Sequence, residues 1–579
     1  MKNVFGKIMN SKFNWLFVLL VLIGINFIVA GWHYRFDLTK EKRYTLSKAT
    51  KDLLRNLDDE VSIEVFLKGD FPAGFRKLAN SADEFLQLLK DQNSSKLSYT
   101  FISPLDEIPG TNKLYGDSLA DIGAVPINLT VQKKAGESSN IIFPVALIHY
   151  KDRYSLVNLY PGASGRISQE EINSAEALME YQFIRSLNKL IQTERPILAY
   201  EVGHGEPADG RTYDLVESLK TDYEFYTFDL RQQTVIPDNI DVLMIVKPAQ
   251  PFTEEDKFKL DQYIMNGGKL ICFIDNLIAE QDSLSFKPET VAYDRNLNLD
   301  DLFFRYGVRI NTDLVMDLQC DMIPFIVGGG IENPQYEFLH WNYFPLFEPG
   351  NSKVLNKNLG YISGRFVNSI DTVTAAEVKK TILLSSSANS RTISTPALVS
   401  LNENKNVPED AKFRQDAIPV AVLLEGKFTS LFKGRVTQSQ IDTLVAHGNE
   451  FKSNSTHDAK VIVAADGDLV LNDVVSSMGY LPMGWNKYTY AEYQRQTEYG
   501  KLFLPVANRE FLMNCVEYFV NNESINQTRN KDIVLRLLDS QKIKNQKPSW
   551  QFINIGLPIL LIILLGYIYQ QLRKKKYSR

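Results

Sequence analysis

The residues of this 579-residue chain whose types and spacing could support chemistry follow three strand-like runs. His204 and Glu206 flank a glycine after the first run, Asp275 follows the second, and Asp466 and Asp468 follow the third. An imidazole beside a carboxylate could act as an acid–base pair or supply two metal ligands, and a D-x-D pair could hold a hard cation. No H-x-x-x-H pair or cysteine partner accompanies the histidine. We therefore interpret these five residues as a candidate ligand or partner surface and assign no catalytic residue, metal or cofactor.

The segment Gly205–Thr212 reads G-E-P-A-D-G-R-T and has the spacing of a phosphate-binding P-loop between a strand and a helix. Arg211 stands where that loop needs lysine, Glu206 and Asp209 would face the phosphates, and Pro207 removes one amide donor. The pattern instead favours a tight strand-to-helix turn, in which glycines allow the backbone conformation and acids lie near a helix N-terminus.

The strand–helix order around this turn is similar to that of class I glutamine amidotransferases, whose nucleophilic cysteine lies on a sharp elbow between small residues. Cys272 lies inside the apolar run Leu270–Ile274, so we expect a buried thiol without a neighbouring base. With Cys320 and Cys515 it brings the total to three, which cannot form a disulfide framework and leaves one unpaired.

Residues 195–276 must supply the scaffold that positions these side chains. Strand-length apolar runs alternate with helical segments there, which predicts a parallel sheet built from βαβ units and a flavodoxin-like or amidotransferase-like α/β fold. Thr253 and Asp256 form an N-cap pattern, and Gly267 supplies a helix end. Carboxyl ends of parallel strands share one edge, where α/β proteins bind ligands. The expected strands are Ile197–Val202, Tyr226–Leu230, Val242–Val246 and Leu270–Ile274.

The segments on either side of this sheet are also patterned. Before it, we expect a helix capped by Ser47, a βαβ unit, hairpin-like runs and a long helix capped by Ser168 and Glu171. The expected strands are 61–67, 97–102, 127–132, 141–150 and 154–159, and the helix of the βαβ unit is 75–89. After it, we expect a polar loop at 277–296, a helix at 297–304, a strand at 308–317, turn-rich connections at 324–337 and 344–358, strands at 419–424 and 460–464, and a helix at 469–476 capped by the aspartates before it.

Phe13–Trp32 is an uncharged run of twenty residues, which matches a bilayer core of about 30 Å. Lys2, Lys7 and Lys12 precede it without an acid, so the positive-inside rule holds the N-terminus in the cytoplasm. A signal peptide has a shorter apolar part of about 7 to 15 residues, and we therefore expect an uncleaved anchor.

Trp550–Gln570 is a second uncharged run, and five basic residues follow it. Both termini are then cytoplasmic and residues 33–549 lie outside. Because the two tails carry eight basic residues and no acids, the formal charge of −5 leaves this outer portion at −13. An acidic exterior without a basic stripe argues against nucleic acid as a partner.

These patterns predict seven parts of the chain. They are a cytoplasmic tail (1–12), a transmembrane helix (13–32), a first periplasmic α/β domain (33–193), a central α/β domain (194–480), a membrane-proximal helical segment (481–549), a second transmembrane helix (550–570) and a basic cytoplasmic tail (571–579). Gly24 and Gly31 in the first span, and Gly556 and Gly566 in the second, are small residues that let helices approach closely in lipid.

The order of these segments resembles the auxiliary, substrate-binding-type component of gliding-motility ABC transporters, the GldG type, over essentially the whole chain. The residues that carry the resemblance are 35–39 (RFDLT), 43–47 (RYTLS), 203–206 (GHGE), 267–269 (GGK) and 306–309 (YGVR), between the two apolar runs. The resemblance implies a bacterial inner-membrane protein with a large periplasmic part, partnered by a GldF-type permease and a GldA-type ATPase, and linked to gliding motility and protein secretion.

Three functions stay open on the residues alone. A non-catalytic transporter subunit would couple the outer domains to a permease, and it is the function that we favour. A solute-binding component would close two lobes over a small ligand. A membrane-anchored hydrolase would need a nucleophile–base pair or a metal cluster, and the sequence offers no such pattern.

Overall fold

The chain is described by a computed structural model and divides into two compact units, residues 1–531 and 532–579. The residues described are 45–124, 126–133, 136–160, 169–192, 194–285, 287–330, 332–348, 355–356, 359–401, 410–495, 506–521 and 540–577, with single residues at 19, 23, 24, 37, 525 and 528.

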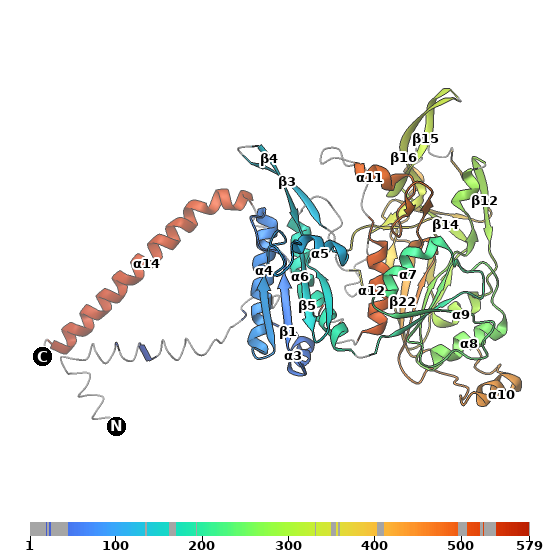
Figure 1. The fold of residues 1–579 in the computed structure, drawn as a ribbon, viewed down its shortest axis with the longest axis horizontal. Coiled ribbons are helices and arrows are strands. Elements are labelled where there is room, and N and C mark those ends of the chain that lie inside the picture. The colour runs from blue at the N-terminus through green and yellow to red at the C-terminus, as the bar shows by residue number, and fades with distance from the viewer. Residues whose placement is uncertain are drawn as a thin grey trace. The chain divides into compact units, whose positions relative to one another are not determined.

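A seven-stranded sheet forms the centre of the larger unit, in the order β19-β22-β23-β10-β9-β7-β8 (Figure 1). The five neighbouring strands from β23 to β8 are parallel to one another. At one side of the sheet, β22 pairs antiparallel with β23, and β19 pairs antiparallel with β22. The expectation of an α/β fold with a parallel sheet is therefore confirmed. The strands are β7 (Ile197–Glu201), β8 (Glu224–Phe228), β9 (Val242–Val246), β10 (Lys269–Phe273), β19 (Val378–Ser385), β22 (Pro419–Gly426) and β23 (Ala459–Ala464).

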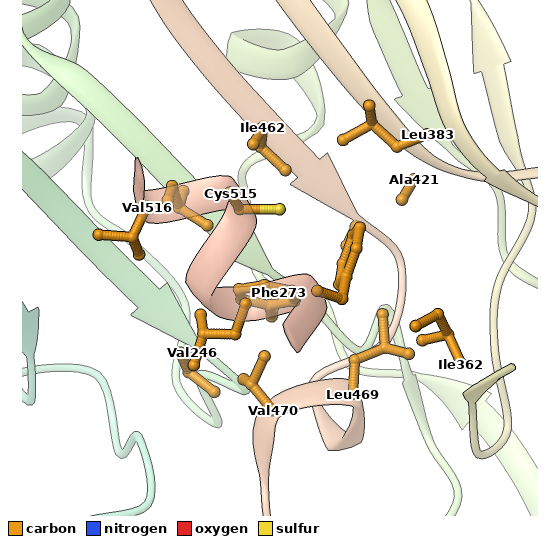
Figure 2. Packing of buried hydrophobic residues seen from close by; sticks show 14 of the residues in the cluster. Val246, Phe273, Ile362, Leu383, Ala421, Ile462, Leu469, Val470, Cys515 and Val516 are labelled. Atoms are coloured by element: carbon orange, nitrogen blue, oxygen red, sulfur yellow. The ribbon is translucent and has the colours of Figure 1, made fainter. Parts of the chain in front are cut away.

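Both faces of this sheet are covered, which explains why its strands are apolar throughout. Alternate residues of β9 enter different cores, because side chains of a strand point to opposite faces: Val242 and Val246 pack in one, and Leu243 and Ile245 in the other. The first core includes α7 (Tyr213–Lys220) and α12 (Asn508–Val520), and Figure 2 shows Cys515 of α12 among these side chains. The second includes α8 (Glu254–Met265) and α9 (Asp300–Tyr306).

The ends of α8 agree with the sequence. The side chain of Thr253 accepts a hydrogen bond from the Asp256 amide, and the Asp256 carboxylate accepts one from the Thr253 amide, so the expected capping box is formed. Gly267 follows the helix with φ 93°, a conformation that favours glycine.

The first module spans 45–192 and has a four-stranded sheet in the order β2-β1-β5-β6. β1 and β2 are connected by α4 and pair in parallel, which confirms the βαβ unit. Ser47 caps α3, as expected. The run expected as one strand at 141–150 is divided: β4 ends at Ile142, and β5 begins after Pro144. The elements are α3 (Lys48–Arg55), β1 (Val61–Val65), α4 (Ala73–Gln92), β2 (Leu97–Phe101), α5 (Tyr115–Asp121), β3 (Ile127–Lys133), β4 (Gly136–Ile142), β5 (Val145–Tyr150), β6 (Arg153–Asn158) and α6 (Gln169–Ile191). Ser168, the expected cap of α6, lies outside the described residues.

A β-rich segment joins β10 to β22, and two expectations there are wrong. The expected polar loop at 277–296 contains β11 (Leu277–Ile278) and β12 (Glu289–Asp294), and the expected connection at 324–337 belongs to a long hairpin of β15 (Cys320–Gly330) and β16 (Asn333–Phe347) that extends away from the sheet in Figure 1. β16 also covers the beginning of the connection expected at 344–358. These strands share a core around Trp341. The remaining strands are β17 (Ile362–Ser363), β18 (Ile370–Thr372), β20 (Ser390–Ser394) and β21 (Ala397–Ser400).

Three more expectations need correction. The strand expected at 308–317 is two strands, β13 (Val308–Ile310) and β14 (Asp313–Asp317), and the helix expected at 297–304 is α9, which begins at Asp300. The helix expected at 469–476 is only the 3-10 turn η5 (Asp468–Val470), followed by β24 (Val474–Val475) and β25 (Gly479–Tyr480). The aspartates before it therefore do not cap an α-helix. The chain continues through α11 (Thr489–Arg495), and α10 (Gln438–Ala446) precedes β23.

The smaller unit contains α14 (Ser540–Tyr577). Its segment Trp550–Lys575 is long and apolar enough to cross a membrane, with a mean hydropathy of 2.2, and it is the one such helix among the described residues. Gly556 and Gly566 lie on it. The first expected span, 13–32, is outside the described residues except for Leu19, Ile23 and Gly24, which are helical; Gly31 is not described.

Candidate functional site

The candidate side chains gather at the carboxyl edge of the seven-stranded sheet. β7, β9, β10 and β23 run in parallel, so the segments after Glu201, Val246, Phe273 and Ala464 leave the sheet at one edge. The chain passes from β7 outward to β8, and then across to β9 on the opposite side of β7. This reversal is a topological switch point, the position at which open α/β sheets form crevices for ligands.

The first group of side chains, which we call the His204 cluster, comprises Glu201, His204, Glu206 and Asp256. His204 Nδ1 lies 3.2 Å from Glu201 Oε1, and His204 Nε2 lies 3.3 Å from Asp256 Oδ2. The imidazole is 1% exposed and stacks on the Phe252 ring, with centroids 3.7 Å apart. One histidine is therefore held between two carboxylates in a buried position.

Backbone contacts fix the turn that carries this histidine. The amides of Ala249 and Gln250 donate to the His204 carbonyl, and the His204 amide donates to Glu206 Oε2 at 2.8 Å. Gly205 has φ 78°, a left-handed conformation that favours glycine. The turn after β7 is thereby bound to the segment after β9.

The electrostatics of the His204 cluster depend on its burial. Burial alone would lower the pKa of His204, but hydrogen bonds with Asp256 and Glu201 outweigh that effect and raise it. Burial, together with the nearby Glu201 carboxylate, raises the pKa of Glu206 to about 10. Burial opposes ionisation of Asp256 as well, but His204, Thr253 and Lys259 lower the pKa of this carboxyl.

The second group, the Lys247 cluster, comprises Lys247, Asp275, Glu280, Asp466 and Asp468. The Lys247 ammonium lies 2.8 Å from both carboxylate oxygens of Asp468, 3.1 Å from Asp275 and 3.2 Å from Glu280. Burial would lower the pKa of Lys247, but these carboxylates raise it. Because a lysine nucleophile must be neutral, this ammonium group is unsuited to nucleophilic catalysis.

The backbone after β23 completes the Lys247 cluster. The Gly467 amide donates to Asp275 at 2.5 Å, and a Cβ at Gly467 would lie 2.5 Å from the Cβ of Lys247, so only glycine fits there. The amides of Arg365 and Asp468 donate to Asp466, and burial beside Asp468 and Asp275 raises the pKa of Asp466 well above its ordinary value.

The P-loop-like segment adopts the turn that the sequence favours. The Arg211 guanidinium pairs with Asp209, 3.0 Å away, and the Asp209 side chain accepts a hydrogen bond from the Arg211 amide at the start of η1 (Gly210–Thr212). Glu206 takes part in the His204 cluster, and the Tyr200 hydroxyl donates to the Pro207 carbonyl. Both acids of this segment, Glu206 and Asp209, therefore form their hydrogen bonds and ion pairs within the turn itself.

The three cysteines, Cys272, Cys320 and Cys515, are buried and form no disulfide. Cys272 lies on β10 inside the second core, and burial raises the pKa of its thiol. Burial raises the pKa of Cys320 in the same way. A nucleophilic cysteine needs an accessible, stabilised thiolate, and neither of these two residues meets that condition.

The structure divides the five candidate residues between the two clusters. Asp275 and Asp468 contact Lys247, Asp466 lies beside them and accepts the Asp468 amide, and His204 and Glu206 belong to the other cluster. Sequence reasoning missed Glu201, Asp256, Lys247 and Glu280 as members, and it named Asp256 only as part of a helix cap. Glu201 and Lys247 could have been found, because each is an ionisable residue at the end of an apolar strand. Glu280 follows the short β11, and no local pattern marks it.

Comparison with known proteins relates both modules to described families. A family model for an ABC-type uncharacterized transport system, the ABC transporter auxiliary domain, matches residues 195–515, which is more than half of the chain. A domain of unknown function, DUF7088, matches residues 40–149. An uncharacterized protein of Borreliella burgdorferi is 22% identical over 458 residues, which are 76% of this chain and 81% of the relative.

Two solved structures show only distant likeness. The N-terminal domain of mmIFT52 is 11% identical, covers 56% of this chain and 98% of that chain, and has a TM-score of 0.30. A thua-like protein from Parabacteroides merdae is 8% identical, covers 57% of this chain and 91% of that chain, and has a TM-score of 0.24.

Proposed function

Because the chain belongs to the auxiliary family of ABC-type transport systems, we propose that it is a non-catalytic, membrane-anchored subunit of an ABC transporter. The family match over 195–515 carries this proposal. The partners are a permease and an ATPase, since the described part of the chain offers neither a convincing phosphate-binding loop nor a pore-forming set of helices. The buried thiols and the ion-paired Lys247 support a role without covalent catalysis.

The more specific part of the proposal is a GldG-type component of a gliding-motility and protein-secretion transporter, working with GldF-type and GldA-type partners. The resemblance of residues 35–47 and 203–206, and the order of segments around them, supports this assignment. The order of the five parallel strands, β8-β7-β9-β10-β23, corresponds to second, first, third, fourth and fifth in the chain. That order supports the flavodoxin-like description of the central fold.

We place the protein in the bacterial inner membrane with both termini in the cytoplasm and residues 33–549 in the periplasm. The exposed apolar helix Trp550–Lys575 and the basic residues Arg573, Lys574 and Lys575 support this orientation of the C-terminus. The uncharged run 13–32 supports a second span.

The membrane helices are the proposed docking elements, and Gly556 offers a direct test. A Cβ at Gly556 would meet only the Phe552 ring, at 3.9 Å, and one at Gly566 or Gly24 would meet nothing within 4 Å. Leucine at Gly556 therefore fits within the helix itself, so a loss of partners would report on helix packing against another protein.

The experiment is affinity retrieval of a tagged chain after extraction in mild detergent. We expect the unaltered chain to retrieve the permease and the ATPase, and Gly556→Leu, alone or with Gly24→Leu, to retrieve less of both. Leu561→Phe is the matched control, because at about 3.6 residues per turn this exposed residue lies roughly opposite the two glycines of α14. A chain that emerges alone contradicts the subunit proposal, and full retrieval with both spans exchanged for unrelated helices contradicts docking through the spans.

A further inference from the structure

The His204 cluster contains two buried carboxylate oxygens without a hydrogen-bond donor in the described part of the chain. These are Oε2 of Glu201 and Oε1 of Glu206, and the two residues are 0% and 6% exposed. Burying a carboxylate oxygen without a partner costs free energy unless a cation or a proton lies beside it. In the metal-free chain a proton between the two glutamates meets this need, in line with the raised pKa of Glu206, and a bound cation would take the place of that proton.

The geometry of these groups suits a small cation. One ligand atom each from Glu201, His204 and Glu206 can be chosen so that all lie within 4.8 Å of one another. A tetrahedral ion with bonds of about 2.0–2.2 Å separates its ligand atoms by roughly 3.3–3.6 Å. His204 Nδ1 and Glu201 Oε1, 3.2 Å apart, are already near that separation. Gly203 permits this arrangement, since a Cβ there would lie 2.5 Å from Glu201 Oε1.

Asp256 has the place of an outer-shell partner. When His204 Nε2 carries the proton, it donates a hydrogen bond to Asp256, 3.3 Å away. The lone pair of Nδ1 is then directed to the side of Glu201. This carboxylate–histidine arrangement fixes the tautomer of metal-binding histidines. Asp256 is itself held by the Thr253 hydroxyl at 2.6 Å and by the Lys259 ammonium at 3.2 Å.

The charges of the His204 cluster also suit a divalent cation. With a cation in place of the proton on Glu206, and with His204 neutral as a ligand must be, the carboxylates of Glu201, Glu206 and Asp256 carry three negative charges, and Lys259 neutralises that of Asp256. A divalent cation neutralises the other two.

We propose that Glu201, His204 and Glu206 bind a divalent transition-metal cation, with Asp256 orienting the histidine. One imidazole nitrogen with two carboxylate oxygens suits Zn²⁺ or Mn²⁺, whereas Ca²⁺ and Mg²⁺ prefer sites made only of oxygen. The ion would join the end of β7 to the N-terminus of α8 at the switch point of the sheet. This site does not depend on the assignment to a transporter.

The test is titration of the full-length, detergent-extracted chain with Zn²⁺ and, separately, with Mn²⁺ and with Ca²⁺, after removal of metals by a chelator. We expect one equivalent of Zn²⁺ or Mn²⁺ to bind and to raise the melting temperature. Glu206→Gln keeps the size of the side chain but removes its charge, and His204→Gln removes the nitrogen ligand; each should abolish this binding. Asp256→Asn should weaken it about 10- to 100-fold.

Two control variants make the result specific. Asp466→Asn changes a buried carboxylate of the Lys247 cluster, and His447→Gln changes an exposed histidine at the end of α10, so both should retain the metal response. Absence of binding by the unaltered chain, preference for Ca²⁺, or equal loss of binding in Asp466→Asn would overturn the proposal. Because the amide that Glu206→Gln introduces can donate a hydrogen bond to Glu201 as the protonated Glu206 does, this variant should fold about as well as the metal-free parent, which separates loss of metal from loss of fold.

Discussion

Replacing Lys247 with methionine tests whether the Lys247 cluster stabilises the carboxyl edge of the sheet. The Lys247 side chain is 6% exposed, and its ammonium group contacts Asp468 and Asp275, whose side chains are 16% and 8% exposed. Removing one partner of such a buried pair leaves uncompensated charge, which costs about 3–5 kcal/mol. Glu280 adds little to this value, because its carboxylate is 40% exposed and screened by water.

The assay is urea-induced unfolding of the full-length chain in detergent, followed by circular dichroism. We expect Lys247→Met to lower the free energy of unfolding of the central domain by about 3–5 kcal/mol. Adding Asp468→Asn should recover about 0.5–3 kcal/mol of that loss, because the two residues interact directly. Arg211→Met, which removes a pair whose side chains are about half exposed, should cost about 0–1 kcal/mol. A loss below 1 kcal/mol for Lys247→Met, or no recovery in the double variant, would refute this reasoning.

Further predictions concern reactivity, pH and topology. Thiol reagents should leave the three buried cysteines unmodified until the chain unfolds, and rapid labelling of Cys272 under native conditions would contradict its burial. Burial opposes ionisation of Asp473, but Arg365, 2.7 Å away, lowers the pKa of this carboxyl below the ordinary 3.8. The stabilising effect of the Asp473 carboxylate is therefore present above about pH 4 and is lost as the pH falls further. The melting temperature of Asp473→Asn should fall less between pH 5 and pH 3 than that of the parent. Parallel curves of melting temperature against pH would contradict the ion pair. A cysteine at exposed position 454 should react with an impermeant reagent in intact cells, and a cysteine at position 574 should not; the reverse pattern would overturn the proposed topology.

Local patterns explain the parts of the fold that the sequence predicts correctly. The apolar runs of β9 and β10 are short, continuous and bounded by turn residues, which is typical of strands buried on both faces. Thr253, Asp256 and Gly267 act through hydrogen bonds and backbone angles within a few residues. Such signals do not depend on distant parts of the chain.

Tertiary context decides the parts that the sequence missed. Gly328–Gly330 lowers strand propensity and suggests a turn, yet pairing with β16 holds these residues in a long hairpin whose register shifts between Ile326 and Gly328. Similarly, the carboxylates of Asp275, Asp466 and Asp468 could be placed at one edge because parallel strands end together there. The contacts of Lys247 with Asp275 and Asp468, and the approach of Glu280, depend on loop packing, which no local pattern encodes.

Native mass spectrometry of the tagged, full-length chain after gentle detergent extraction most directly tests the proposed role in an ABC transporter. The proposal predicts a defined assembly that contains this chain together with an ABC permease and an ATPase, and ATP hydrolysis that depends on the ATPase subunit. A chain recovered alone or only as copies of itself, from cells that express both other subunits, would contradict the proposal.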